Sequence, residues 1–325
     1  MKLEVSQHSL PLSKPFSITG HTFTHLNTVW VTLEEEGFVG RGEGTGSYYL
    51  GEDPTTISRQ IEEVRSEIEA GITPEQLQSL LPRGGARNAV DCALWDLACK
   101  QQSQSIWQLL EIEPHELVTV ATIGVATVED MAAQASAWAQ YPALKIKLDN
   151  DSPLDKVGAI RQARPDASLV IDVNQGWSME ELVIYAPAMA ALGVEMIEQP
   201  LPRGGDDELR GYDSPVPLGA DESCLGLADL EQACEKYDVI NIKLDKCGGL
   251  SEALAIVDRA RELGKKLMVG NMTGSSLSMA PSSVIGQWCD FVDIDGPLLL
   301  ERDIEHGLAY RAGGLVGLPT PELWG

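Results

Sequence analysis

Six charged residues follow one another at nearly even intervals through the middle and second half of the chain. Lys145 and Lys147 lie within one apolar run, and the others end four later apolar runs: Asp172, Glu198, Asp221 and Lys243. From Lys147 onward the steps are 25, 26, 23 and 22 residues, each about one strand plus one crossover helix. Residues i and i+2 of a strand face the same way, so Lys145 and Lys147 share a face. This pattern is typical of an active site at the carboxyl ends of barrel strands.

Three carboxylates at successive strand ends favour a hard divalent cation such as Mg²⁺, which takes oxygen ligands. Zinc would prefer His or Cys, and the six cysteines are scattered without a CxxC pair. Any one of Asp172, Glu198 and Asp221 could be an ordinary acid at a barrel rim, but three in succession favour a metal site. Asn174 could support a ligand or contact a substrate, and a structural loop amide is the alternative.

Lysines inside apolar strands need solvent or acid partners. Lys147 and Lys243 would come from nearly opposite strands of a barrel, so a substrate carbon between them would meet a base on each face. A free Lys has a pKa of about 10.4, so desolvation and a neighbouring cation must lower it for a base. The positive charges of Lys145 and the metal would lower the pKa of Lys147. Lys246 competes with Lys243, but its three-residue offset predicts that it faces away.

Such a site predicts proton abstraction α to a carboxylate, with the metal stabilising the resulting enediolate. Abstraction on one face and proton return on the other would invert the carbon.

The same spacing predicts an α/β fold: a (β/α) barrel, TIM-like but modified, with an N-terminal α+β capping domain. Eight short β-rich runs alternate with helical segments. These runs are residues 118–125, 143–148, 169–173, 195–199, 217–221, 239–244, 266–269 and 291–295. We expect the capping domain, with substrate-specificity loops, over residues 1–112. The barrel would span residues 113–305, and the tail 306–325 would pack back on the capping domain.

Within the first 110 residues, alternation over 25–35 predicts a strand and 37–51 a glycine-rich turn region. Apolar residues at helical spacing from 86 to 97 predict a helix that docks this region on the barrel. Its charged residues Arg87, Asp91 and Asp96 are more typical of ion pairs than of ligands.

The chain carries 49 acidic and 24 basic residues, a formal net charge of −25. Such a charge repels phosphate backbones and anionic membranes, so we expect a small-molecule ligand and neither nucleic acid nor membrane as partner. The first residues carry no apolar signal segment, and no apolar run approaches 18 residues, which predicts a cytoplasmic protein. Assembly into a homo-oligomer stays open.

Together these motifs resemble the enolase superfamily, in its muconate-lactonizing-enzyme subgroup, over nearly the whole chain. The matching segments are Lys145-Ile146-Lys147, Asp172-Val173-Asn174, Glu198-Gln199-Pro200-Leu201, Asp221-Glu222-Ser223, Asn241-Ile242-Lys243-Leu244-Asp245-Lys246 with Gly248-Gly249, and Asp293-Ile294-Asp295-Gly296-Pro297. The resemblance implies that the three acids bind one Mg²⁺ per subunit. It further implies that Lys147 and Lys243 are the acid/base catalysts and that Lys145 is their electrostatic partner.

Asp293 and Asp295 resemble the pair with which dipeptide epimerases hold the substrate's α-ammonium; a solvated strand-end pair or a helix cap is the alternative. The resemblance therefore implies a dipeptide epimerase, most similar to those that act on L-Ala-D/L-Glu in murein recycling. Glutamate-specific relatives present a cation from an early loop, where residues 17–27 offer only His21 and His25. These histidines could partly substitute for it, with His21 as a substrate-binding residue. Tyr48 and its neighbour in residues 44–52 could line a pocket for an apolar residue instead, so an L-Ala-X epimerase of other specificity stays open.

Three other functions remain. An o-succinylbenzoate synthase, a dehydratase of menaquinone synthesis, would use the same lysines and metal on a substrate without an ammonium group. A muconate-type cycloisomerase is a weaker alternative. A non-catalytic barrel that binds a metal or a small acid would not need both Lys147 and Lys243.

Overall fold

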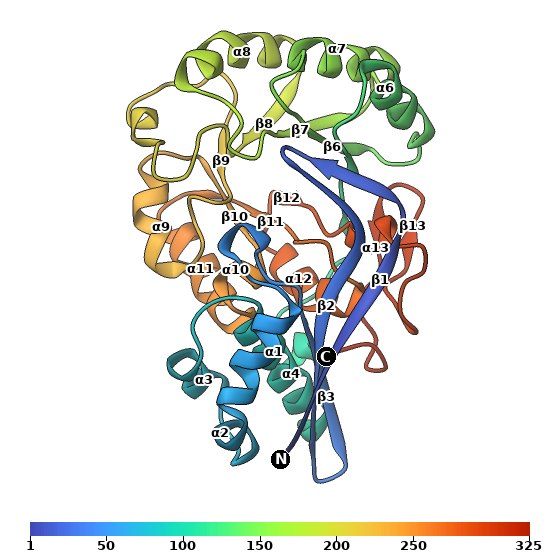
Figure 1. Cartoon of the computed structure of the whole chain (residues 1–325), viewed down its shortest axis with the longest axis vertical. Coiled ribbons are helices and arrows are strands. Elements are labelled where there is room, and N and C mark those ends of the chain that lie inside the picture. Colours follow the sequence, from blue (N-terminus) through green and yellow to red (C-terminus); the bar gives the residue numbers. More distant parts are fainter.

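The computed structural model describes all 325 residues, and its centre is a curled sheet of eight parallel strands (Figure 1). Each strand pairs with the next one along the chain, as in a barrel. The strands are β5 (Ala121–Ile123), β6 (Ala143–Lys147), β7 (Ser168–Asp172), β8 (Val194–Glu198), β9 (Leu218–Ala220), β10 (Val239–Ile242), β11 (Lys266–Val269) and β12 (Phe291–Val292). A 2.9 Å hydrogen bond from the Val120 amide to the Val292 carbonyl links the two edges. The predicted barrel fold is confirmed.

Helices surround this sheet (Figure 1). They are α6 (Val128–Ala137), α7 (Pro153–Ala163), α8 (Met179–Ala191), α9 (Leu227–Cys234), α10 (Leu244–Cys247), α11 (Leu250–Glu262), α12 (Ser276–Gly286) and α13 (Gly296–Leu299). Between β8 and β9 the chain forms only a 3₁₀ turn, η2 (Asp207–Leu209), in a segment rich in proline and glycine, which do not sustain helices. No helix of the chain is both long and apolar enough to cross a membrane.

Side-chain alternation along β6 separates the core from the site. Leu144 and Ile146 are fully buried in the main hydrophobic core, whereas Lys145 and Lys147 face the barrel interior, because alternate residues of a strand point to opposite faces.

Two expected strands are shortened more than the others relative to the apolar runs that predict them. The run 118–125 contributes only Ala121–Ile123 to the barrel, because Leu117–Val118 (β4) pairs with β14 (Leu315–Val316), which in turn pairs with β13 (Tyr310–Arg311). The run 291–295 ends as a strand at Val292, since the chain turns there to begin α13 with Pro297 in its first turn.

The first part of the chain forms an antiparallel sheet packed on helices, as predicted. The sheet contains β1 (Lys2–Ile18), β2 (His21–Glu35) and β3 (Phe38–Gly44). The helices are η1 (Tyr48–Leu50), α1 (Pro54–Glu63), α2 (Arg65–Glu69), α3 (Pro74–Leu80), α4 (Gly85–Gln102) and α5 (Ile106–Leu109).

The prediction of a turn region over residues 37–51 is wrong for residues 38–44, which form β3. The glycines of β3 allow close packing against α4 and do not form turns. A Cβ on Gly40 would lie 2.2 Å from the Ala93 carbonyl oxygen, and one on Gly42 would lie 2.1 Å from that of Ala89. Glycine therefore lets α4 lie directly against the strand.

Helix α4 connects this region to the barrel, and its charges are structural as expected. Arg87 donates to the Gly248 carbonyl at 3.2 Å, and Asp91 accepts from the Ser251 amide at 2.9 Å. Asp96 forms an ion pair with a lysine one turn along α4. The carboxyl-terminal segment also reaches α4: Trp324 donates through its indole nitrogen to the Cys92 carbonyl at 2.9 Å, and the Gly325 amide donates to Asp96 at 2.7 Å.

The β1–β2 hairpin extends over the carboxyl ends of the barrel strands (Figure 1). The Val125 amide donates to the Ser17 carbonyl at 2.9 Å, and the Thr19 hydroxyl donates to the Leu148 carbonyl at 2.9 Å. The hairpin thus brings side chains of the first region to the mouth of the barrel.

A buried acid at this junction predicts a pH-dependent stability. Glu43 is 1% exposed and accepts hydrogen bonds from the amide and hydroxyl of Ser275. Burial raises its pKa from 4.5 to about 7, with the nearby charge of Asp245 adding to the effect. The folded chain therefore holds this proton more tightly than the unfolded chain, so stability falls as pH rises from 4.5 through 7.

Glu43→Gln keeps the shape and removes the charge. The rise in the pKa of Glu43 from 4.5 to about 7 corresponds to about 3 kcal/mol, so we expect a gain in unfolding free energy of that order at pH 8 and little gain at pH 5. Urea unfolding at both pH values measures it, with exposed Glu301→Gln as the control. An equal effect at both pH values would exclude Glu43 as the titrating group.

Candidate active site

The predicted lysines converge with acids on one cavity at the carboxyl ends of the barrel strands. Side chains from both the barrel and the first region line it. They are Phe16, Ile18, Phe23, Tyr48, Tyr49, Thr122, Lys145, Lys147, Asn174, Asp221, Glu222, Lys243, Asn271, Met272, Thr273, Asp293, Asp295 and Leu299. The remaining predicted acids, Asp172 and Glu198, are fully buried and contact Lys145.

The three predicted metal ligands lie together. Asp172 and Glu198 end the neighbouring strands β7 and β8 in register with each other, and Asp221 follows β9. One carboxylate oxygen of each lies within 4.8 Å of the others, and all three side chains are buried. Parallel strands bring their carboxyl ends to one edge of the sheet, which is why residues about 25 apart in the sequence meet here.

In each of these carboxylates one oxygen is held by a neighbouring donor. The bonds are Asn174 N–H to Asp172 Oδ1 (2.9 Å), Asn241 Nδ2 to Glu198 Oε1 (2.6 Å) and Lys246 Nζ to Asp221 Oδ1 (2.7 Å). The second oxygens contact only lysine ammonium groups, and Glu198 Oε2 has no hydrogen bond although Lys145 Nζ lies 2.7 Å away. Three buried carboxylates, each with a second oxygen available to a cation, could hold a metal such as Mg²⁺.

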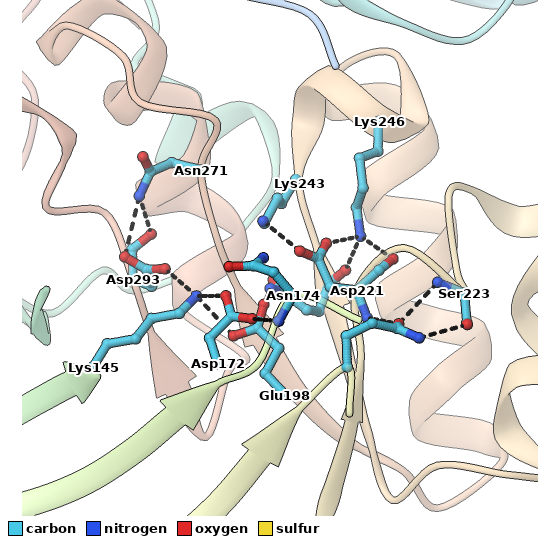
Figure 2. A network of polar contacts seen from close by, with 12 residues as sticks. Lys145, Asp172, Asn174, Glu198, Asp221, Ser223, Lys243, Lys246, Asn271 and Asp293 are labelled. Carbon is cyan, nitrogen blue, oxygen red and sulfur yellow. Dashed lines mark hydrogen bonds and ion pairs between the residues drawn. The ribbon is translucent and has the colours of Figure 1, made fainter. Parts of the chain in front are cut away.

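Lys145 lies among three carboxylates (Figure 2). Its Nζ is 2.7 Å from Glu198, 2.8 Å from Asp293 and 3.3 Å from Asp172. Burial opposes its charge, but Asp293, Glu198 and Asp172 outweigh burial and hold the pKa of Lys145 well above its ordinary value. These surroundings favour the charged ammonium form of Lys145.

The two other lysines approach the acids from opposite sides of the barrel. Lys147 Nζ donates to Asp172 at 2.5 Å and to Asn174 at 3.3 Å, and Lys243 Nζ donates to Asp221 at 2.6 Å. Burial opposes the charge of Lys243, yet Asp221 and then Glu198 raise its pKa above the ordinary value. This direction is opposite to the one expected for a base, because the nearest groups are carboxylates. A cation bound to the same carboxylates would weaken that effect.

The predicted orientation of Lys246 is wrong. Its Nζ lies 2.7 Å from Asp221 Oδ1, on the side of that carboxylate away from Lys243 (Figure 2). The prediction assumed a continuing strand, but β10 ends at Ile242 and Lys243 is the N-cap of the short helix α10. Residues three apart in a helical turn lie on the same side, so both lysines reach Asp221.

Asp293 and Asp295 both line the cavity, although they follow β12 instead of sharing a strand face. Asp293 also accepts a 3.2 Å hydrogen bond from the amide of Asn271, and Asp295 accepts one of 2.7 Å from the Thr122 backbone. Burial raises the pKa of Asp295 to about 7, and the charge of Asp293 adds to the rise.

Sequence analysis missed Asn271 and Glu222. Asn271 follows the end of β11 by two residues, the same offset as Asn174 after β7, and that shared offset could have identified it. Glu222 adjoins Asp221, is 2% exposed and lines the cavity, and its Oε2 has no hydrogen-bond partner. Burial, followed by the charges of Asp221 and Asp172, raises the pKa of Glu222 to about 8.

Tyr48 and Tyr49 line the cavity at the positions expected of a specificity loop. His21 lies one layer farther out: it stacks on Tyr48 with ring centroids 5.3 Å apart and borders a neighbouring cavity that it shares with His25. The hairpin instead presents apolar side chains to the site, namely Phe16, Ile18 and Phe23.

Two known protein families match most of the chain. Residues 1–111 match the mandelate racemase/muconate lactonizing enzyme N-terminal domain, and residues 129–312 match the enolase C-terminal domain-like family. The chain belongs to the enolase superfamily.

Within this superfamily, the chain is similar to an L-Ala-D/L-Glu epimerase of Escherichia coli K12, at 41% identity over 96% of this chain and 98% of that protein. It is also similar to an enolase family member from Agrobacterium tumefaciens with bound sodium and L-Ala-L-Glu, at 40% identity over 99% of each chain and a TM-score of 0.97. A dipeptide epimerase from Enterococcus faecalis with Mg and L-Leu-L-Tyr is 28% identical over 98% of this chain and 96% of that chain, with a TM-score of 0.91. Epimerases are isomerases, so this chain is an enzyme of that class.

Proposed function

We propose that this enzyme is a Mg²⁺-dependent dipeptide epimerase that inverts the α-carbon of the second residue. The observation that carries the proposal is the placement of Lys147 on β6 and Lys243 just after β10. These strands lie four apart in a ring of eight, so their side chains enter the cavity from opposite sides. The similarity to L-Ala-D/L-Glu epimerase over nearly the whole chain supports this function.

The two lysines would perform a proton transfer across the substrate carbon. The neutral amine of one lysine takes the α-proton, and the ammonium of the other delivers a proton to the opposite face. The carbon inverts, and the two lysines finish with exchanged protonation states. The reverse reaction starts from that exchanged state, so one site converts either epimer into the other.

Asp172, Glu198 and Asp221 would hold the Mg²⁺. The bound ion supplies positive charge that stabilises the negative charge developing on the substrate carboxylate as its α-proton leaves. Lys145 adds a second fixed positive charge beside Asp172 and Glu198.

Asp293 and Asp295 would bind the α-ammonium of the first residue. Both are buried acids that line the cavity beside Lys145, and a buried carboxylate pair binds an ammonium group through charge-assisted hydrogen bonds. The precursor of o-succinylbenzoate offers no such group, which favours the epimerase over the dehydratase.

We propose glutamate as the second residue, and hence a role in murein recycling, on the strength of the 41% identical relative. A second candidate is an L-Ala-X epimerase with apolar X. The observation favouring it is that Phe16, Ile18 and Phe23 line the cavity and no cation other than the three lysines does. We also propose the division into a capping domain at 1–112, a barrel at 113–305 and a tail at 306–325.

Proton NMR in D₂O with Mg²⁺ tests the proposal. The purified chain is given L-Ala-L-Glu, a series of other L-Ala-L-X dipeptides and, separately, the o-succinylbenzoate precursor. We expect the α-proton signal of the second residue to disappear while the signals of a diastereomer appear. The rates of this change for the different dipeptides give the order of preference for the second residue X. If no dipeptide reacts and the precursor is dehydrated, the proposed function is wrong.

A further inference from the structure

We propose that Lys246 is a positioning residue of the metal site, which fixes Asp221 and, through Asn241, Glu198. The inference rests on the proposed metal-dependent function. Lys246 Nζ donates to Asp221 Oδ1 at 2.7 Å, to the Asp221 carbonyl at 2.7 Å and to the Asn241 carbonyl at 2.9 Å. An ammonium group has three protons, so these three bonds occupy all of them.

This geometry separates Lys246 from the catalytic lysines. Its side chain is 2% exposed and does not line the active-site cavity. It contacts Oδ1 of Asp221, while Lys243 contacts Oδ2 from the other side of the same carboxylate (Figure 2). Lys246 therefore has neither a free proton position nor access to a substrate carbon.

The contacts of Lys246 extend to a second proposed ligand. Asn241, whose carbonyl accepts from Lys246, donates through its side chain to Glu198 Oε1 at 2.6 Å. One ammonium group thus ties the end of β9 to β10, and β10 in turn orients the end of β8. Because Lys246 holds Oδ1 of Asp221, the oxygen of this carboxylate left for the proposed cation is Oδ2, which Lys243 also contacts.

The turn that carries Lys246 is itself held in place. Helix α10 ends at Cys247 and is capped by Gly248, which adopts a φ of +86°, and Arg87 of α4 donates to the Gly248 carbonyl at 3.2 Å. A Cβ at Gly248 would lie 2.4 Å from Arg87 Nε, so glycine permits this approach. The first region of the chain thereby fixes the turn behind the metal site.

A positioning role and a purely electrostatic role of Lys246 predict opposite changes in Mg²⁺ affinity when its side chain is removed. If Lys246 only added positive charge near the cation, its removal would reduce repulsion and strengthen Mg²⁺ binding. If it positions Asp221, its removal takes the ammonium donor away from Asp221 Oδ1 and from two backbone carbonyls and lets the ligand move, which weakens binding. Loss of an outer hydrogen-bond partner of a metal ligand costs about 10- to 100-fold in affinity.

Calorimetric titration of the full-length chain with Mg²⁺, without substrate, tests the proposal. We expect about 10- to 100-fold weaker binding for Lys246→Met and an intermediate loss for Lys246→Gln, which keeps a donor but no charge. The electron paramagnetic resonance spectrum of bound Mn²⁺ should broaden in the same order, because the coordination geometry becomes less uniform. Lys156→Met is the control, since Lys156 of α7 is equally buried but pairs with Asp149, which is not a residue of the site.

Unchanged or tighter Mg²⁺ binding in both Lys246 variants would overturn the positioning role. If Lys246→Met does not fold, Lys246→Gln decides by the same comparison with wild type. Absence of Mg²⁺ binding by the wild-type chain would instead refute the proposed metal-dependent function, so the two failures are distinguishable.

Discussion

Lys147→Ala and Lys243→Ala should each lose epimerisation by at least about 100-fold, because a positioned acid/base group contributes about 10²- to 10⁴-fold. Each variant should nevertheless exchange the α-proton of one epimer with solvent deuterium, since the remaining lysine can remove and return a proton on its own face. The two variants should differ in which epimer they exchange. Proton NMR of L,L- and L,D-dipeptides in D₂O measures both quantities.

Mg²⁺ affinity is the companion measurement for these two variants. Lys243 donates to the proposed ligand Asp221 and Lys147 donates to Asp172, so either loss could disturb the metal site rather than the proton transfer. Retained Mg²⁺ binding together with lost epimerisation assigns the defect to chemistry. A variant that still interconverts the epimers at the wild-type rate would contradict the two-base mechanism. A non-catalytic barrel would keep ligand affinity in both variants and show no exchange in the wild type.

The barrel and the meeting of its acids could be predicted because both depend on repeating local structure. A strand and its crossover helix take about 25 residues, and parallel strands end at a common edge. An acid at the end of each apolar run, such as Asp172 or Glu198, must therefore approach its neighbours whatever the rest of the chain does. The fold and the superfamily are confirmed, whereas the roles of the individual site residues remain predictions.

The features that sequence analysis missed depend on contacts between distant segments or on where an element ends. Gly42 in β3 faces α4, and its sequence neighbours do not reveal a helix that follows more than 40 residues later. The reach of Phe16 and Phe23 into the cavity depends on the hairpin crossing the barrel mouth. The orientation of Lys246 depends on the strand ending at Ile242, and a strand extended by a few residues would have pointed it away.

Asp295→Asn should reduce kcat/KM for L-Ala-L-Glu by about 100-fold while leaving the site intact. The amide keeps the shape of the carboxylate and an oxygen that can accept from the Thr122 amide. It removes one charge from the pair that would bind the substrate's α-ammonium, and loss of one partner of a buried charge pair costs about 3 kcal/mol. The matched substrate is N-propionyl-L-Glu, which is L-Ala-L-Glu without its amino group. Racemisation of that compound should be no faster in wild type than in the variant.

The pH dependence supplies an independent test of the same residue. Burial and the charge of Asp293 raise the pKa of Asp295 to about 7, so its neutral form predominates below that pH and its ionised form above it. Only the ionised form pairs with an ammonium group, so wild-type kcat/KM for L-Ala-L-Glu should rise as pH increases through 7. The part of this rise that comes from Asp295 should be absent for Asp295→Asn and for N-propionyl-L-Glu, so their profiles should be less steep near pH 7 and keep only the rise that comes from the lysine base. A variant that epimerises the dipeptide as fast as wild type, with the same pH profile, would remove Asp295 from substrate recognition and return the dehydratase to consideration.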